Sequence, residues 1–212
     1  MARHRRYIGR SVLDLGCGGG VLGALLAPTG REYLGVDANP DMLREARKLP
    51  GLRFLDADVT HDRIPGRFDT VTMLGNAMAH FTVADMDRLL AARRANVRPG
   101  STFLLDYRDL IAMFWQGTWT KVRVTTHVRG TITHRARLLD LEKGTLHLRA
   151  RPSTRKWVLD WSHALWSPFI LEMLMRHHGW LLAHRSPPKA RRGASRIPQD
   201  YVDVYRLEAT RA

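Results

Sequence analysis

Cysteine and long apolar runs are scarce in this chain. Its 212 residues include one cysteine, Cys17, so an internal disulfide and a multi-cysteine metal site are excluded, and we expect no metal site. No run of 18 or more apolar residues occurs, and the opening stretch MARHRRYIGR lacks the apolar segment of a signal peptide. These absences predict a cytoplasmic protein without a membrane partner.

Acidic residues are also scarce in the second half of the chain. Residues 120–212 contain 18 Lys and Arg against 7 Asp and Glu, whereas residues 1–119 contain 16 against 13. A basic half of this kind suggests nucleic acid or anionic ligands as partners, although a solvated basic surface explains the charge more simply. The length predicts a single domain over residues 1–212.

Apolar strand-like segments alternate with helix-like segments through the first half of the chain. The predicted strands are SVLDLGC, REYLGVDAN, LRFLDADV, FDTVTML and STFLLDYRD. Between them, VLGALLA and PDMLREARKL have helical spacing, and VADMDRLLAARRANVRPG reads as an amphipathic helix that Pro99 and Gly100 stop. Five such alternations predict an α/β fold with a parallel sheet and helices on both of its faces.

The pattern changes after the fifth strand. From about 120 to 166, short alternating runs broken by Gly130, Gly144 and Pro152 predict a small antiparallel β insert. A helix follows, with Ser167 as its N-cap and Gly179 just past its end. Two further strands, WLLAH and YVDVYRLEA, close the chain around the basic loop RSPPKARRGASRIPQ.

The first strand ends in a glycine-rich turn, VLDLGCGGG. Gly16, Gly18 and Gly20 remove side chains that would block a ligand from the backbone. The dinucleotide-binding fingerprint needs a further glycine where Val21 stands, and Asp14 would repel a pyrophosphate. The turn therefore favours a ligand that carries an ammonium group.

Two more carboxylates follow predicted strands. Asp37 ends the second strand about 20 residues after the glycines, where it could accept both hydroxyls of a ribose or else cap the next helix. Asp58 ends the third strand, where it could accept the exocyclic amine of an adenine. The fourth strand ends in MLGNAMAHF, in which Asn76 and His80 stand among small residues and could hold a bound molecule or cap the next helix.

These motifs, in this order and spacing, resemble class I S-adenosylmethionine-dependent methyltransferases over residues 11–110. The resemblance implies a doubly wound, mostly parallel seven-stranded Rossmann-like sheet whose last strand is antiparallel, and S-adenosylmethionine as the cofactor. The glycine turn would bind the methionine end, Asp37 the ribose, and Met42 the adenine face. The implied cofactor residues are Asp14, Gly16, Gly18, Gly20, Asp37, Ala38, Met42, Asp58, Val59, Leu74, Gly75 and His80.

A narrower resemblance concerns MLGNAMAHF followed by VRPGSTFLLDYRD, which are similar to the corresponding stretches of glycine and sarcosine N-methyltransferases. It implies that His80 lies against the cofactor, that Asn76 faces an amine substrate, and that Arg108 pairs with the carboxylate of that substrate. The residues themselves leave alternatives: Arg108 could form a structural salt bridge, and His80 a hydrogen bond at the helix entry.

The sequence therefore predicts methyl transfer to the nitrogen of a small amine or amino acid. An RNA methyltransferase that uses the basic C-terminal half, and a cofactor-binding protein without turnover, stay open as alternatives. Glycine and sarcosine N-methyltransferases carry a longer segment before the first strand, and that segment closes their pocket. This chain has about ten residues there. We therefore expect an open pocket, or one covered by a partner subunit in a homo-oligomer or by the β insert. Five tryptophans around the insert could form such a lid or simply pack: Trp115, Trp119, Trp157, Trp161 and Trp166.

Overall fold

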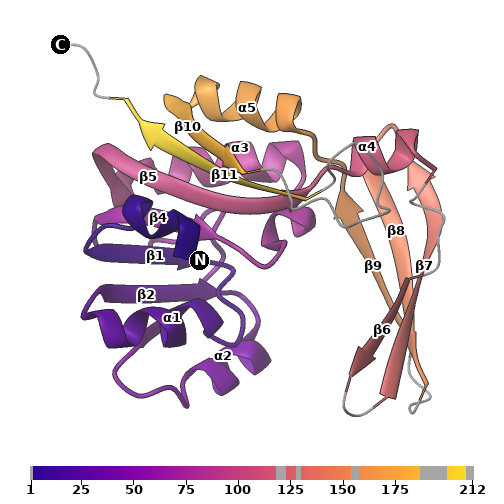
Figure 1. The fold of residues 1–212 in the computed structure, drawn as a ribbon, viewed down its shortest axis with the longest axis horizontal. Coiled ribbons are helices and arrows are strands. Elements are labelled where there is room, and N and C mark those ends of the chain that lie inside the picture. The colour runs from indigo at the N-terminus through magenta and orange to yellow at the C-terminus, as the bar shows by residue number, and fades with distance from the viewer. Residues whose placement is uncertain (1, 118–122, 128–129, 154–157, 187–199, 209–212) are drawn as a thin grey trace.

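The computed structural model describes residues 2–117, 123–127, 130–153, 158–186 and 200–208. They form two β-sheets with helices packed around the larger one (Figure 1). Two of the five tryptophans named above, Trp119 and Trp157, and most of the predicted basic loop lie outside the described residues. In the described part, no helix combines the length and the apolar character needed to cross a membrane.

The larger sheet has seven strands in the order β10-β11-β5-β4-β1-β2-β3. Strand β11 runs antiparallel to both of its neighbours, and the other strands share one direction. The predicted fold class is therefore confirmed. The strands are β1 (Ser11–Leu15), β2 (Glu32–Asp37), β3 (Arg53–Asp56), β4 (Phe68–Met73), β5 (Val97–Arg108), β10 (Trp180–Ser186) and β11 (Asp200–Leu207).

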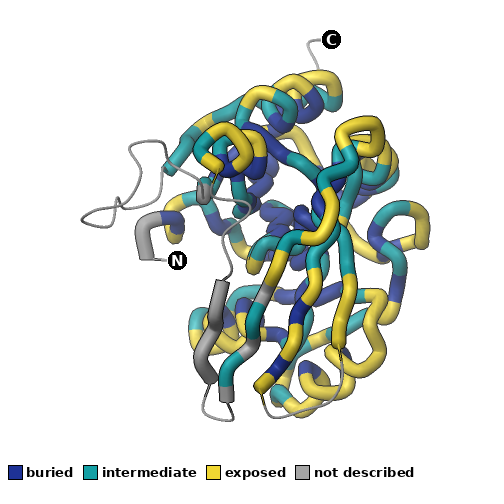
Figure 2. Tube along the Cα trace, turned by 90° about the vertical axis from the view of Figure 1, so that its right-hand side faces the viewer, coloured by how far each residue is buried: buried dark blue, intermediate teal, exposed yellow. Residues whose placement is uncertain are grey.

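The core lies on both faces of this sheet, because apolar side chains fill both faces of its central strands. All five residues of β1 are buried: Leu13 and Leu15 belong to one apolar cluster and Val12 to the other. The buried part of the tube in Figure 2 lies behind the small sheet. A strand buried on both faces needs helices on both sides, as the alternating sequence predicts.

Short polar signals set the starts of the helices. Asn39 caps α2 (Pro40–Ala46) by accepting the amides of Asp41 and Met42, and Thr82 and Asp85 form a capping box at α3 (Val83–Arg93). The predicted cap at Ser167 is confirmed for α5 (Pro168–His177). The remaining helices are α1 (Val21–Leu26), α4 (Leu110–Trp115) and the 3₁₀ turns η1 (Ala2–Tyr7), η2 (Ala27–Thr29), η3 (Ala77–His80) and η4 (Arg94–Asn96).

The predicted end of the third long helix is wrong. Helix α3 ends at Arg93, and Pro99 and Gly100 lie inside β5. Val97 pairs with Phe68 and Thr102 with Thr70, so the residues between them form a bulge in which Gly100 has φ 85°. The proline and glycine therefore accommodate an irregular strand rather than stop a helix.

The small sheet contains four antiparallel strands: β6 (Arg123–His127), β7 (Gly130–Asp140), β8 (Thr145–Pro152) and β9 (Leu159–Ala164). It stands beside the carboxyl ends of the parallel strands (Figure 1). The tryptophans near it differ in role. Trp166 is buried and donates its indole N–H to the carbonyls of Met78 and Phe81, whereas Trp115 is 84% exposed. Trp166 is thus core packing, one of the two predicted alternatives.

Candidate functional site

Two adjoining cavities lie at the carboxyl ends of β1, β2 and β4, each of about 480 Å³. Gly16, Gly18, Leu74 and Gly75 line both of them. We call the cavity that also contacts Asp14 the first cavity, and the one that also contacts Asp37 the second cavity. In open α/β sheets, ligands bind at this edge of the strands.

The glycine turn forms the wall between the two cavities. Gly16 and Gly18 have φ of 68° and 51°, a left-handed region that disfavours other residues. The amides of Gly16 and Cys17 donate to the carbonyl oxygen of Val36 at 2.8 and 3.0 Å, so the turn is fixed to β2. A Cβ at Gly18 would lie 3.1 Å from the Met42 Cε atom, so the end of the Met42 side chain would have to shift by a few tenths of an ångström.

Asp37, at the end of β2, holds the other side of this turn. One carboxylate oxygen accepts the Gly18 amide at 2.8 Å, and the other accepts the Asn39 amide at 2.9 Å. Because Asn39 supplies the side-chain cap of α2, the alternative role of Asp37 as that cap does not apply. The carboxylate is half-buried and lines the second cavity.

Asp14 is buried at the wall of the first cavity. The Tyr33 hydroxyl donates to one of its oxygens at 2.7 Å, and the Thr72 hydroxyl donates to the other at 2.6 Å. Burial raises the pKa of Asp14 to about 6, because desolvation outweighs these two hydrogen bonds. A nearby cation would stabilise its charged form.

The second cavity brings together six of the predicted cofactor residues besides those that line both cavities. Its walls include Asp37, Ala38, Met42, Asp58, Val59 and His80. Strand β3 ends at Asp56, so the expectation that Asp58 ends it is wrong by two residues. Asp58 accepts the amide and the hydroxyl of Thr60 at 2.7 and 2.5 Å, and these bonds lower the pKa of its carboxyl group.

Three predicted residues are not among the described residues that line the two cavities. Gly20 is the N-cap position of α1, where a Cβ would meet the Leu49 and Phe54 side chains. Asn76 has φ 62°, and its backbone N–H donates to the Asp106 carboxylate at 2.7 Å. Arg108 is the last residue of β5 and pairs in register with Asp200 of β11.

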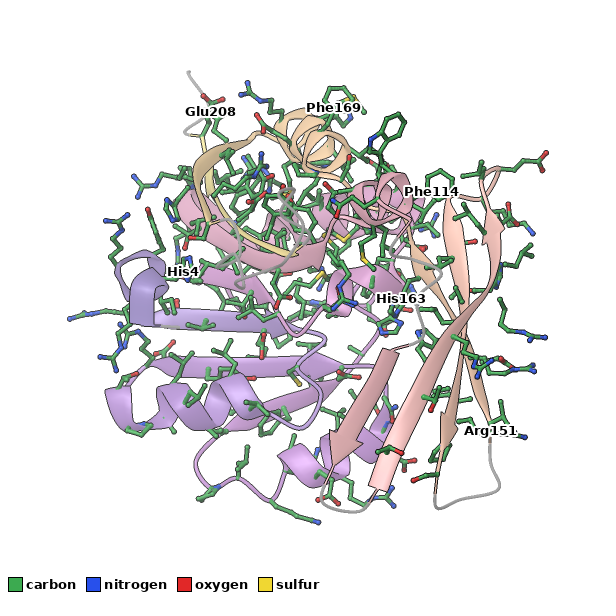
Figure 3. All side chains as sticks on the ribbon, turned by 45° about the vertical axis from the view of Figure 1, so that its right-hand side comes forward. His4, Phe114, Arg151, His163, Phe169 and Glu208 are labelled. Carbon is green, nitrogen blue, oxygen red and sulfur yellow. The ribbon has the colours of Figure 1, made fainter. Side chains whose placement is uncertain are left out.

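The small sheet contributes a histidine that sequence reasoning missed. The rings of His163, on β9, and His80 make an edge-to-face contact with centroids 5.3 Å apart. The indole N–H of Trp161 donates to His163 Nε2 at 2.8 Å. Figure 3 shows His163 where the small sheet approaches the main sheet. No local motif marks His163, because its position depends on how the two sheets meet.

The N-terminal turn contributes a second missed residue, His4. It is buried and lines the first cavity. His4 Nε2 and Ser186 Oγ are hydrogen-bonded at 3.1 Å. The segment before β1 therefore covers one edge of the first cavity.

Asp106 also lines that cavity and was not predicted. A carboxylate at the end of β5 is the one signal that could have identified Asp106.

Comparison with known proteins finds similarity to methyltransferases. Residues 12–100 match a family model described as a methyltransferase domain. A ubiquinone biosynthesis O-methyltransferase of Methylococcus capsulatus is 35% identical over 106 residues, which are 47% of this chain and 44% of that protein. A cypemycin N-terminal methyltransferase of a Streptomyces species is 33% identical over 115 residues, 51% of this chain and 46% of that protein.

A solved structure shares this fold over nearly the full chain. An S-adenosylmethionine-dependent methyltransferase of Clostridium acetobutylicum superposes with a TM-score of 0.78 over 98% of this chain and 88% of that one, at 16% identity. The matched regions span less than half the length of the two sequence relatives above. Residues 12–100 thus match a methyltransferase-domain model, and the chain shares the fold of that S-adenosylmethionine-dependent methyltransferase. None of these matches points to glycine or sarcosine as the acceptor.

Proposed function

We propose that this protein transfers the methyl group of S-adenosylmethionine to the nitrogen of a small amine or amino acid. The observation that carries the proposal is the pair of cavities that meet at the glycine turn, with Asp14 on one side and Asp37 on the other. Each half offers the groups that one end of the cofactor requires.

The second cavity fits the adenosine half of the cofactor. The Asp37 carboxylate faces the glycine turn, and its remaining acceptor capacity suits the two ribose hydroxyls. Met42 is 43% exposed and offers an apolar surface for the adenine face, beside Val59. The pKa-lowering bonds from Thr60 hold Asp58 in its charged form, which can accept an exocyclic amine.

The first cavity fits the methionine half. Asp14 and Asp106 both line it, and the ammonium group of the cofactor is a cation. Their carboxylates complement that charge in a partly buried setting, where charge interactions are stronger than in water. Gly16, Gly18 and Gly75 allow the ligand to approach the backbone closely.

His80 is proposed to handle the proton of the acceptor. S-adenosylmethionine supplies a methyl group on a sulfonium, which a nucleophile can displace directly. An alkyl ammonium must lose a proton before its nitrogen can attack, and a neutral imidazole is a suitable base near neutral pH. His80 is exposed at the edge of the second cavity, next to His163.

His163 and Trp161 are proposed to orient His80. An indole N–H can only donate, so His163 Nε2 must be unprotonated while it accepts the bond from Trp161. The neutral His163 then carries its proton on Nδ1. A second positive charge is thereby kept away from a site that must bind a cationic cofactor and release a proton.

Arg108 and Asn76 are proposed to contact the acceptor from the end of β5 and the turn after β4. Asp106 and Arg108 are two residues apart on β5, so they belong to the same face of the strand, and Asp106 accepts the backbone N–H of Asn76. The planar guanidinium of Arg108 suits a carboxylate on the acceptor. The site thus offers contacts for both ends of an amino acid.

Methyl transfer from labelled S-adenosylmethionine tests the proposal. Glycine, sarcosine, ethanolamine and dimethylamine are compared with catechol and with a mixed-sequence RNA. Label on amine nitrogen, with transfer reduced far more than cofactor affinity in His80→Phe, is the expected result. Label on catechol oxygen alone would favour hydroxyl acceptors, which the O-methyltransferase relative also suggests. Label on RNA alone, or no transfer to any acceptor, would overturn the proposal.

A further inference from the structure

The small sheet has two chemically different faces. Trp161 and His163 lie on the face that meets His80. Because side chains alternate along a strand, Asp160 and its register partner Arg149 lie on the opposite face. Figure 3 shows His163 near the main sheet and Arg151 at the outer end of the small sheet.

Four exposed arginines gather on this outer face, which we call the arginine face: Arg135, Arg137, Arg149 and Arg151. Arg135 and Arg149 are direct register partners on β7 and β8. Like charges placed opposite each other across two strands destabilise a sheet. This arrangement costs folding stability and would gain from a bound anion.

One acid within the described residues partly balances this charge. Arg149 Nε and Nη2 donate to the two carboxylate oxygens of Asp160 at 2.7 and 2.8 Å. Within the described part of the chain, Arg135, Arg137 and Arg151 make no ion pair at all. The arginine face therefore keeps a net positive charge of about three.

The arginine face is also concave. A groove of about 390 Å³ lies over β7 and β8, lined by the four arginines with Thr133 and Val158. These six lining residues include no aromatic side chain. Arginine binds phosphate through two parallel hydrogen bonds, whereas recognition of unstacked bases relies on aromatic rings.

From this charge, shape and composition, we propose that the arginine face docks a nucleic-acid strand through its phosphate backbone, without reading its sequence. A protein partner would be expected to meet apolar or aromatic anchors, and the described residues that line the groove include one valine. A second copy of this chain carries a net charge of +14 and is repelled.

This docking goes beyond the proposed methyl transfer. The arginine face and the contact with His80 are on opposite sides of the small sheet. A strand held on the arginine face therefore leaves both cavities open. Binding can be measured without any acceptor or turnover, so failure of one proposal does not imply failure of the other.

The test measures the anisotropy of a fluorescent 20-nucleotide mixed-sequence RNA between 50 and 200 mM salt. The triple variant Arg135→Gln, Arg137→Gln, Arg151→Gln leaves the Arg149–Asp160 pair intact. We expect it to bind at least about tenfold more weakly at 50 mM salt, with a log–log salt slope smaller by about 2, at 0.7 for each lost single-strand contact.

A matched variant removes three charges elsewhere. Arg63 and Arg67 lie between β3 and β4, and Arg94 lies in η4. All three are exposed and none lines the groove, so their change to Gln should leave the RNA affinity within about threefold. Equal losses in the two triple variants would show a general effect of net charge and overturn the proposal. So would a wild type that does not bind RNA at 50 mM salt.

Two further arms complete the test. Poly-glutamate or phosphatidylserine vesicles that bind the arginine face as tightly as RNA would overturn the choice of nucleic acid. The single variant Arg135→Thr removes the like-charge pair and should keep or raise the melting temperature while it weakens RNA binding. A lower melting temperature with unchanged RNA binding would instead assign Arg135 a structural role and contradict the proposal.

Discussion

The Gly18 amide donates a hydrogen bond to the Asp37 carboxylate at 2.8 Å. This bond joins the glycine turn after β1 to the end of β2, between the two cavities. Because the same carboxylate accepts the Asn39 amide, its position is fixed before any ligand binds. The Asp37 carboxylate therefore shapes the turn and at the same time lines the second cavity.

A side chain at Gly18 should abolish cofactor binding. Gly18→Ala places a Cβ 3.1 Å from the Met42 side chain, in a left-handed conformation and at the wall of both cavities. Gly30→Ala is the matched control, since Gly30 has φ 67° but open space around it and lies away from the cavities. Calorimetry should detect S-adenosylhomocysteine binding to Gly30→Ala and not to Gly18→Ala; equal binding would contradict the assignment of this turn.

Cofactor affinity should depend on pH through Asp14. Its pKa of about 6 means that the carboxyl group gains a proton as the pH falls below that value. If the ammonium of S-adenosylhomocysteine needs the charged form, the dissociation constant should rise by up to about tenfold per pH unit below 6. Asp14→Asn should bind weakly and without this dependence between pH 5 and 7.5. An unchanged pH profile in the variant would remove Asp14 from the ligand site.

The folding stability should show the opposite trend from the same group. The folded pKa of Asp14 lies above its ordinary value of 3.8, so the folded protein binds more protons than the unfolded chain between these two values. The contribution of Asp14 is therefore fully present below pH 3.8 and is lost as the pH rises through 6. The free energy of unfolding, measured in urea, should fall between pH 3.8 and 6 by more in the wild type than in Asp14→Asn. The comparison of the two proteins removes the pH dependence that they share through other groups.

Loss of His163 should slow turnover more than it weakens cofactor binding. His163→Phe keeps an aromatic ring against His80 but removes the bond from Trp161. We expect a lower kcat, a shifted pH profile of kcat and an unchanged dissociation constant for S-adenosylhomocysteine. Trp161→Phe, which removes the donor only, should show a smaller effect in the same direction. A lower melting temperature with an unchanged pH profile would indicate packing alone.

Arg108→Lys separates an acceptor contact from a structural one. Lysine keeps the charge but lacks the two-pronged guanidinium, so the KM for an amine that bears a carboxylate should rise by roughly ten- to a hundredfold, for about 1.5–3 kcal/mol. Cofactor affinity should hold. If instead the melting temperature falls and the KM is unchanged, Arg108 is a structural partner of its neighbours. An enzyme that accepts only amines without an acid group would also contradict the carboxylate contact.

The sequence predicts the local features of this fold well and the non-local ones poorly. The turn at Gly16 and Gly18, the strand end at Asp37 and the cap at Ser167 depend on neighbouring residues, and the local pattern is sufficient for each. The bulge at Pro99 and Gly100 was misread, because pairing with β4 outweighs the helix-breaking character of these two residues. His4 and His163 reach the site only through the packing of distant segments, so no pattern in the chain marks them.

The most direct test of the central assignment is calorimetric binding of S-adenosylmethionine to the wild type, Asp37→Ala and Asp41→Ala. Asp41 is exposed on α2, four residues from Asp37, and does not line either cavity. The account predicts that the wild type and Asp41→Ala bind alike, and that Asp37→Ala binds more weakly by about 1–3 kcal/mol, because the ribose hydroxyls lose their acceptor. No binding by the wild type, or the same affinity in Asp37→Ala, would contradict it.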